Sequence, residues 1–267
     1  MTITVPELNA RIDYSGAQGC TVWVGYVVED KSAFRQFLAG PVHERGADAE
    51  FNNAWEKEIK ALDSTGMSST FLEDFLGASV EEKSWEIGEA LAETVLATDA
   101  ERTVVWPWNE ARDRKTPRAS LPGADLVGFV EDHLGVKLIL GEVKTSYDAK
   151  TPPSVMSGRT GMGWQLADTA ASLTILKTLF KWLRARCLSD VLLVMYHQAL
   201  KRFLTSDGKD LAIVGVLLRD TVPDERDIKG RATFLAGMLA TPTQVELSAW
   251  YLPEKIVDWP EISRGML

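Results

Sequence analysis

The segment Gly123–Ser146 constrains the fold of this 267-residue chain more than any other part of it. It contains two short apolar runs, Leu126–Val130 and Val136–Leu140, which are separated by the polar residues 131–135. Apolar runs of this length around a polar turn containing glycine are typical of a β-hairpin. The segment therefore predicts two adjacent antiparallel strands inside a sheet.

Chemically useful side chains lie at one end of this predicted hairpin. Asp125 precedes the first strand, and Glu142 and Lys144 end the second. Residues two apart on a strand point to the same face, so the carboxylate and the amine of the second strand would lie together. Two carboxylates, with the backbone carbonyl of Val143 as a third ligand, suit a hard cation such as Mg²⁺ or Mn²⁺. A lysine beside them could orient or help to deprotonate a water, so the pattern predicts metal-dependent phosphodiester hydrolysis.

The rest of the chain predicts a mixed α/β architecture. Helical spacing, caps and apolar runs predict helices at 31–38, 48–62, 69–73, 80–97 and 164–186, and strands at 20–28, 190–197, 210–218 and 245–251. The order of these elements indicates an α/β core built on a mixed sheet with flanking helices. We expect a mainly helical N-terminal region, residues 1–79, that faces a partner or regulates a domain at 80–267, or else one compact domain.

The charge distribution limits how such a protein could meet nucleic acid. The formal net charge is −9, and residues 29–93 alone hold 15 acids against 6 bases. Basic clusters lie at 112–118 and 181–186. The basic loop 109–118 and the Gly-rich loop 157–163 with Arg159 are the expected DNA contacts, and the acidic region could face a protein partner or be a solvated surface. Three tryptophans flank the predicted site and could stack on bases: Trp106, Trp108 and Trp164.

Several other classes of protein are excluded by the absence of their motifs. The three histidines lack zinc-site spacing, the serines form no GxSxG elbow, and the Gly-rich loop lacks the Lys-Ser/Thr ending of a P-loop. The two cysteines form neither a CxxC motif nor a disulfide framework. No apolar run is long enough to span a bilayer, and the N-terminus lacks the features of a signal peptide. We therefore expect a cytoplasmic protein with reduced thiols.

The motif Asp125, followed by Glu142-Val143-Lys144 at the end of the next strand, resembles the PD-(D/E)xK nuclease superfamily, the restriction-endonuclease-like fold. The likeness covers roughly residues 80–220. It includes Glu89 on the preceding predicted helix and Gln165 at the start of the following one. The chain departs from the family pattern in one place, since Gly123-Ala124-Asp125 stands where the family has Pro-Asp.

This resemblance implies roles for the individual residues. Asp125 and Glu142 would be metal ligands, Lys144 would be catalytic, and Gln165 would contact a phosphate or a water. Glu89 would be an auxiliary acid, although Glu86 or Glu93 on the same helix could serve instead. Taken from the residues alone, each also has a plain structural interpretation, as a turn residue, a solvated ion pair or a surface acid.

The size, the helical N-terminal region and the layout of the motif also resemble the HamA-type nuclease subunits of the Hachiman antiphage defence system. That likeness implies a Mg²⁺-dependent DNA endonuclease held in check by a helicase (ATPase) partner. Two other hypotheses stay open. The chain could be a catalytically silent member of the fold that binds DNA or acts as a scaffold, or an unrelated α/β protein in which the three residues coincide by chance.

Overall fold

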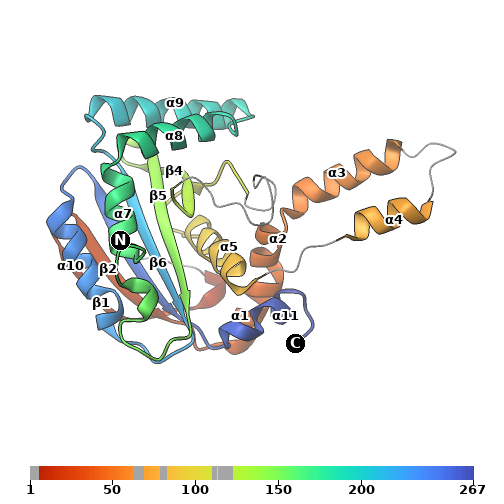
Figure 1. Cartoon of the computed structure of the whole chain (residues 1–267), viewed down its shortest axis with the longest axis horizontal. Coiled ribbons are helices and arrows are strands. Elements are labelled where there is room, and N and C mark those ends of the chain that lie inside the picture. Colours follow the sequence, from red (N-terminus) through yellow and green to blue (C-terminus); the bar gives the residue numbers. More distant parts are fainter. Residues whose placement is uncertain (1–5, 63–68, 79–82, 110–112, 114–122) are drawn as a thin grey trace.

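A seven-stranded mixed sheet forms the centre of the computed structural model, which describes residues 6–62, 69–78, 83–109, 113 and 123–267 (Figure 1). The strand order is β1-β2-β7-β6-β5-β4-β3. Strands β2, β7, β6 and β5 are parallel to one another, whereas β1 pairs antiparallel with β2, and β3, β4 and β5 form antiparallel pairs. The strands are β1 (Arg11–Gln18), β2 (Thr21–Val27), β3 (Val104–Val105), β4 (Leu126–Asp132), β5 (Gly135–Ser146), β6 (Ala212–Arg219) and β7 (Gln244–Tyr251).

Helices cover both faces of this sheet, so the predicted α/β fold with a mixed sheet between helices is confirmed. One buried apolar cluster joins one face to α1, α5 and α11, and a second joins the opposite face to α7, α8, α9 and α10 (Figure 1). The helices are α1 (Lys31–Phe37), α2 (His43–Gly46), α3 (Ala49–Leu62), α4 (Ser69–Gly77), α5 (Ser84–Ala97), α7 (Met162–Ala171), α8 (Leu173–Arg184), α9 (Asp190–Thr205), α10 (Lys229–Met238) and α11 (Trp259–Ser263).

The predicted hairpin is present as β4 and β5. Its turn is closed by Asp132, whose Oδ1 accepts a hydrogen bond from the N–H of Leu134 at 2.8 Å. Gly135 follows with a φ of +101°, a conformation that side chains with a Cβ rarely adopt. The hairpin therefore has the register that the apolar pattern requires, with Leu126 opposite Gly141.

The prediction of a strand at 190–197 was wrong, because these residues begin the helix α9. Its N-cap is Ser189, whose hydroxyl accepts from the N–H of Leu192. The buried positions Tyr196, Ala199 and Phe203 have helical spacing, which becomes visible only when the segment is followed to its end. Val191 is 71% exposed, so the apolar run at 190–196 does not mark a strand buried on both faces.

The predicted single helix at 164–186 is two helices, α7 and α8. Ser172 separates them with an extended backbone, and its hydroxyl caps α8 by accepting from the N–H of Ile175 at 3.3 Å. An apolar stripe that continues across a capping residue cannot by itself reveal such a break, because each half keeps its own helical spacing.

The N-terminal region supplies both strands and helices. Strands β1 and β2 precede residue 79 but extend the same sheet, through the parallel pairing of β2 with β7. Helices α3 and α4 instead form an arm that projects away from the sheet (Figure 1). Among the described residues, no helix combines the length and the apolar character needed to cross a membrane.

Candidate functional site

Asp125 is fixed at the start of β4 by backbone hydrogen bonds. Its N–H donates to the carbonyl of Gly141 at 3.0 Å, and its Oδ2 accepts from the N–H of Val143 at 2.9 Å. The pairing of β4 with β5 ends at the next residue, Leu126. The Asp125 carboxylate therefore accepts a hydrogen bond from a backbone N–H of β5 that has no partner in β4. It lies at the point where the pairing of the two strands ends.

Glu142 and Lys144 lie together on β5, as their spacing predicts. The Nζ of Lys144 is 2.6 Å from Oε1 of Glu142, and both side chains point to the face that carries α7 and α8. Glu142 is 5% exposed, whereas the Lys144 side chain keeps 18% of its surface. In this ion pair the carboxylate is buried, whereas the amine is partly accessible to solvent.

The carboxyl group of Glu142 also interacts with that of Asp125. Burial, and next the negative charge of Asp125, raise the pKa of Glu142 to about 7, although Lys144 acts in the opposite direction. Asp125 also accepts a hydrogen bond from the N–H of Val143, the residue after Glu142, so the two carboxyl groups lie close together. Two carboxylates this close repel each other unless a proton or a cation lies between them.

The backbone of Val143 can add a third oxygen. The N–H and the C=O of one residue in a strand point to the same side, as they must in a hydrogen-bonded pair. Since the N–H of Val143 meets Asp125, its carbonyl points to the same edge of the sheet, where β4 has ended. The predicted ligand set of Asp125, Glu142 and Val143 is thereby brought to one place.

The first turn of α7 lies over the site because of a glycine in β6. Gly215 is the register partner of Glu142. A Cβ on Gly215 would lie 2.6 Å from Sδ of Met162 and 3.2 Å from Cδ1 of Leu166, so only glycine lets α7 approach this closely. Gln165 precedes Leu166, and its Oε1 is buried without a hydrogen-bond partner among the described residues. An amide oxygen of this kind can accept a hydrogen bond from a water, including one bound to a cation.

The helix acids of α5 are on the other side of the sheet. Val143 and Thr145 face α5, and a Cβ on Gly88 would collide with Oγ1 of Thr145. Glu86 is used in the helix cap, where its Oε2 accepts from the N–H of Lys83, and Glu93 forms a buried ion pair with Arg45 at 2.6 Å.

These contacts assign Glu86 and Glu93 to the structure of α5 and its surroundings. The assignment of Glu89 as an auxiliary acid stays a prediction.

The predicted DNA-contact loops are only partly described. Residues 110–112 and 114–122 of the basic segment lie outside the described residues. Arg159 is exposed in the Gly-rich loop, and Arg231 of α10 holds that loop by donating to the carbonyl of Met156 at 2.8 Å. Arg231 could not be identified from the sequence, because no local pattern in α10 indicates a contact with Met156.

The three flanking tryptophans have different environments. Trp108 is 1% exposed and donates through Nε1 to the carbonyl of Val127, so it cannot stack on bases as predicted. Trp106 donates to the carbonyl of Glu93. Trp164 is half-exposed and packs on Phe234, which leaves it accessible beside the site.

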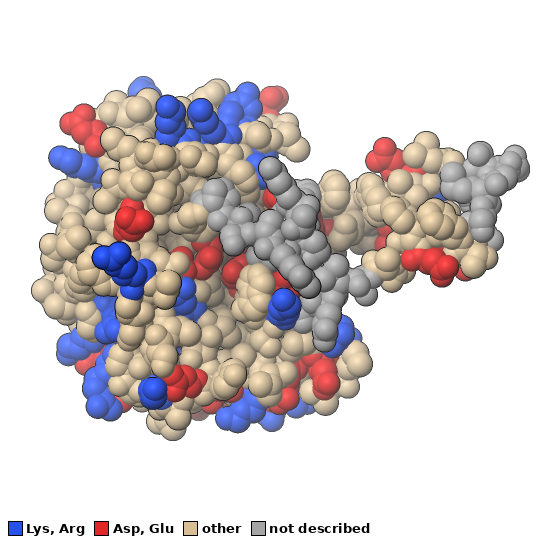
Figure 2. Space-filling view, viewed as in Figure 1, with Lys and Arg blue, Asp and Glu red and all other residues tan. Residues whose placement is uncertain are grey.

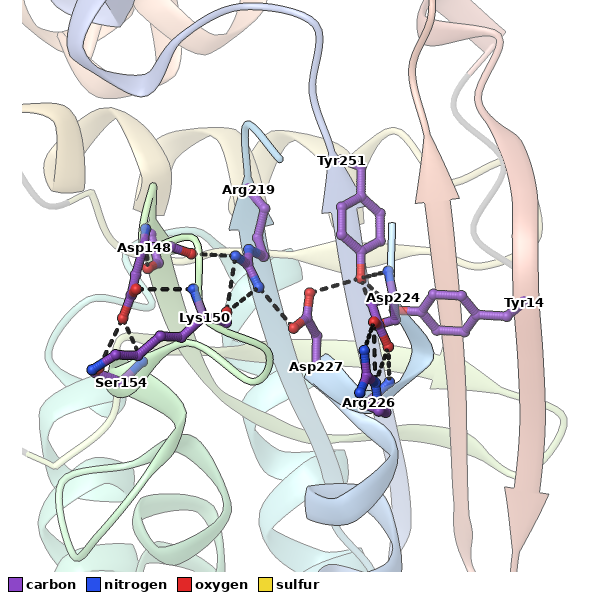
Figure 3. A network of polar contacts seen from close by, with 10 residues as sticks. Tyr14, Asp148, Lys150, Ser154, Arg219, Asp224, Arg226, Asp227 and Tyr251 are labelled. Carbon is purple, nitrogen blue, oxygen red and sulfur yellow. Dashed lines mark hydrogen bonds and ion pairs between the residues drawn. The ribbon is translucent and has the colours of Figure 1, made fainter. Parts of the chain in front are cut away.

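A second polar cluster, which the sequence reasoning missed, lies at the carboxyl ends of β6 and β7 (Figure 3). The Arg219 guanidinium is 2.7 Å from Asp227, and it also donates to the carbonyls of Asp148 and Lys150. The Tyr251 hydroxyl donates to Asp227 at 3.0 Å. Arg219 and Asp227 are almost fully buried. Their charges are thus engaged with each other, and the cluster fixes the chain that leaves β5 rather than forming a site.

The residues present fit a magnesium-type ion better than zinc. Within the described ranges, no three His, Cys, Asp or Glu side chains are grouped as metal ligands. Mg²⁺ is usually bound by only one or two carboxylates and several waters, so Asp125, Glu142 and a carbonyl suffice for it. The Oε1 of Gln165, in the first turn of α7, is buried without a hydrogen-bond partner among the described residues and so could accept from a water of a hydrated ion.

Comparison with known proteins adds no assignment: the chain matches no protein-family model, no curated protein and no solved structure.

Proposed function

We propose that this chain is a metal-dependent nuclease that hydrolyses phosphodiester bonds of DNA. One observation carries the proposal: Asp125 and Glu142 lie close together at the edge of the sheet, with Lys144 beside them. Two acids and a lysine with this spacing are the residues of the PD-(D/E)xK motif. The order of helix α5, hairpin β4–β5, helix α7 and parallel strand β6 is also the one that the resemblance implies, and it supports the same proposal.

The proposed roles follow from where each group lies. Asp125, Glu142 and the carbonyl of Val143 would hold Mg²⁺ or Mn²⁺, which supplies charge neutralisation and a more acidic water when bound. Lys144 would stabilise the negative charge that develops on the reacting phosphate, and it could orient the attacking water. Gln165 would accept a hydrogen bond from that water or from one of the waters of the ion.

The test is cleavage of plasmid and linear DNA by the purified chain, with RNA as a comparison substrate. Reactions contain Mg²⁺, Mn²⁺ or EDTA, and each is repeated with any helicase encoded beside the gene. Glu142→Gln should abolish metal-dependent cleavage. Glu131→Gln is the matched control, because Glu131 is exposed at the other end of the same hairpin. A folded wild-type protein that cleaves nothing under all these conditions would contradict the proposal.

We also propose that a partner, a helicase in an antiphage defence system, controls the nuclease. The arm of α3 and α4 supports this proposal, because it projects from the body and exposes large apolar side chains (Figure 1). These are Phe51, Leu62, Phe71 and Phe75. Residues 49–77, which include this arm, hold six acids against two bases, so the arm suits a protein partner better than DNA.

The alternative proposal is a catalytically silent subunit of the same fold. It predicts a protein that binds DNA equally well with and without Mg²⁺ and cleaves none, and Glu142→Gln would then change neither property. The raised pKa of Glu142 favours the active enzyme, since perturbed acids gather at functional sites.

A further inference from the structure

A row of cations follows one side of α8. Lys177, Lys181 and Arg184 are all exposed. At 100° per residue they lie within an arc of about 60° on the helix surface. The opposite part of the helix is apolar and packs into the core through Leu176, Leu179, Phe180 and Leu183. Figure 2 shows Lys and Arg side chains gathered over α8, on the same face of the molecule as acidic side chains nearer its middle.

These cations are not paired with any acid in the part of the chain that the structure describes. Among the described residues, none of the three takes part in an ion pair, whereas Lys60 and Lys229 are paired with glutamates four residues away. Unpaired cations in a row repel one another, so a ligand with several negative charges would be favoured there.

The row leads to the candidate site. Ile175, in the first turn of α8, packs against Gly123, because a Cβ on that glycine would lie 2.8 Å from Cγ2 of Ile175. Thr169 at the end of α7 donates to the carbonyl of Gly123 at 2.8 Å. Asp125 is two residues further along the chain. The start of α8 is therefore joined to the carboxylates by a short, packed connection.

We infer that α8 binds the phosphate backbone of duplex DNA and guides it to Asp125 and Glu142. This inference rests on the proposed nuclease function for the identity of the nucleic acid. Lys177 and Arg184 are seven residues apart, or about 10 Å along the helix axis. One strand of a duplex carries a phosphate about every 3.4 Å of its axis, so the row can meet about three phosphates of one strand.

The composition of the row favours a duplex over a single strand. Proteins that bind single strands without sequence preference stack bases on exposed aromatic side chains. Beside the cations, α8 exposes Thr174 and Thr178, and Phe180 is buried. The partly exposed Trp182 is engaged by the ring of Trp108 and by the Arg186 guanidinium, 3.8 Å above its own ring. A straight row of cations with hydroxyl neighbours makes contacts to phosphates, which carry no sequence information.

The experiment measures binding of a labelled 20-base-pair duplex by fluorescence anisotropy in EDTA, between 50 and 200 mM salt, so that cleavage cannot interfere. The test variant replaces the three cations of α8 with Gln: Lys177→Gln, Lys181→Gln and Arg184→Gln. A matched control removes three exposed lysines elsewhere, so that both variants change the net charge equally: Lys57→Gln, Lys209→Gln and Lys255→Gln.

Each phosphate contact makes log K fall by about 0.9 per unit of log salt. The loss of three contacts in the α8 variant should therefore make this salt dependence shallower by about 2.7. Wild-type affinity should then fall about 40-fold more than that of the variant between the two salt concentrations. The control should keep the wild-type slope. Thermal unfolding of both variants separates this role from the favourable position of cations near a helix C-terminus, which affects stability but not the slope.

The two proposals fail in different ways. An unchanged slope in the α8 variant, an equal loss in the control, or no duplex binding by the wild type would overturn the inference. A protein that cleaves DNA but keeps its slope in the α8 variant leaves the nuclease proposal intact. If the α8 variant has a shallower salt dependence but the wild type never cleaves DNA, the DNA-binding role of α8 is supported and the nuclease proposal is refuted.

Discussion

Replacing Glu142 with Gln should make the metal-free protein more stable at pH 8, while removing its proposed activity. The pKa of the Glu142 carboxyl is raised from 4.5 to about 7, first by burial and then by Asp125. Keeping this group charged in the folded protein therefore costs on the order of 3 kcal/mol. A neutral amide avoids that cost and can still accept a hydrogen bond from Lys144.

The sign of the effect with pH follows from the same values. Between pH 4.5 and 7 the folded protein binds a proton at Glu142 that the unfolded chain has released. Wild-type stability from this group thus falls as the pH rises through this window and is constant above it. Integrated from pH 5.5 to 8, the loss is about 2 kcal/mol in the wild type and absent in Glu142→Gln.

The assay is urea unfolding of both proteins in EDTA at pH 5.5 and pH 8. Glu254→Gln is the matched control. Burial alone would raise the pKa of Glu254, but Arg35 and Lys31 outweigh it and the pKa is lowered. Its charged form is therefore stabilising above the unfolded pKa, and the control should lose stability at pH 8.

Adding Mg²⁺ at pH 8 should stabilise the wild type and have a much smaller effect on Glu142→Gln, since an ion that binds only the folded state shifts the unfolding equilibrium. The reasoning would be refuted if Glu142→Gln were less stable than the wild type at pH 8, or if the gap between the two proteins were equal at both pH values. Either result would mean that the charged form of Glu142 does not destabilise the folded protein.

Three further substitutions test other parts of the structure. Lys144→Met should lower the cleavage rate at pH 8 by about 10²-fold or more, as the loss of one charge-stabilising donor does in other enzymes, with no loss of secondary structure by circular dichroism. Arg219→Met should destabilise the protein by about 3–5 kcal/mol in urea, because it leaves the buried Asp227 charge without its partner; an effect under 1 kcal/mol would contradict the importance of that ion pair. Gly88→Ala should cost about 1–3 kcal/mol through its collision with Thr145, and Thr145→Ala in the same chain should restore part of that stability.

The hairpin could be predicted from the sequence because its information is local. The alternation of faces fixed Glu142 and Lys144 on one side of β5, and the polar turn fixed the register. The parallel strand β6 was also predictable, since a strand buried on both faces is a continuous apolar run. Helix α9 was not predicted, because its first residues form an apolar run as well and its helical spacing is visible only along its later turns.

The parts of the site that could not be predicted depend on contacts between distant segments. The approach of α7 needs Gly215, 50 residues after Gln165, and glycine in a strand gives no sign of which helix it admits. The Arg219 cluster had a weaker signal, a charged residue that ends a buried strand, but its partner Asp227 is known only from the fold. The environment of Glu89 had no local signal, since the sequence cannot say which face of the sheet its helix covers.

The burial of Glu142 is itself an argument for function. The neighbouring inward positions of β5 are Leu138 and Leu140, and an apolar side chain at 142 would continue that face without cost. The chain instead has a carboxylate there, close to that of Asp125 and paired with Lys144. The buried Arg219–Asp227 pair matches one charge with one charge, whereas Arg102 is paired with two buried acids, Asp99 and Glu246. An excess of negative charge is therefore not unique to the site, but at Glu142 burial and the charge of Asp125 raise the pKa of the carboxyl group. A divalent cation bound there would turn this cost into a ligand set.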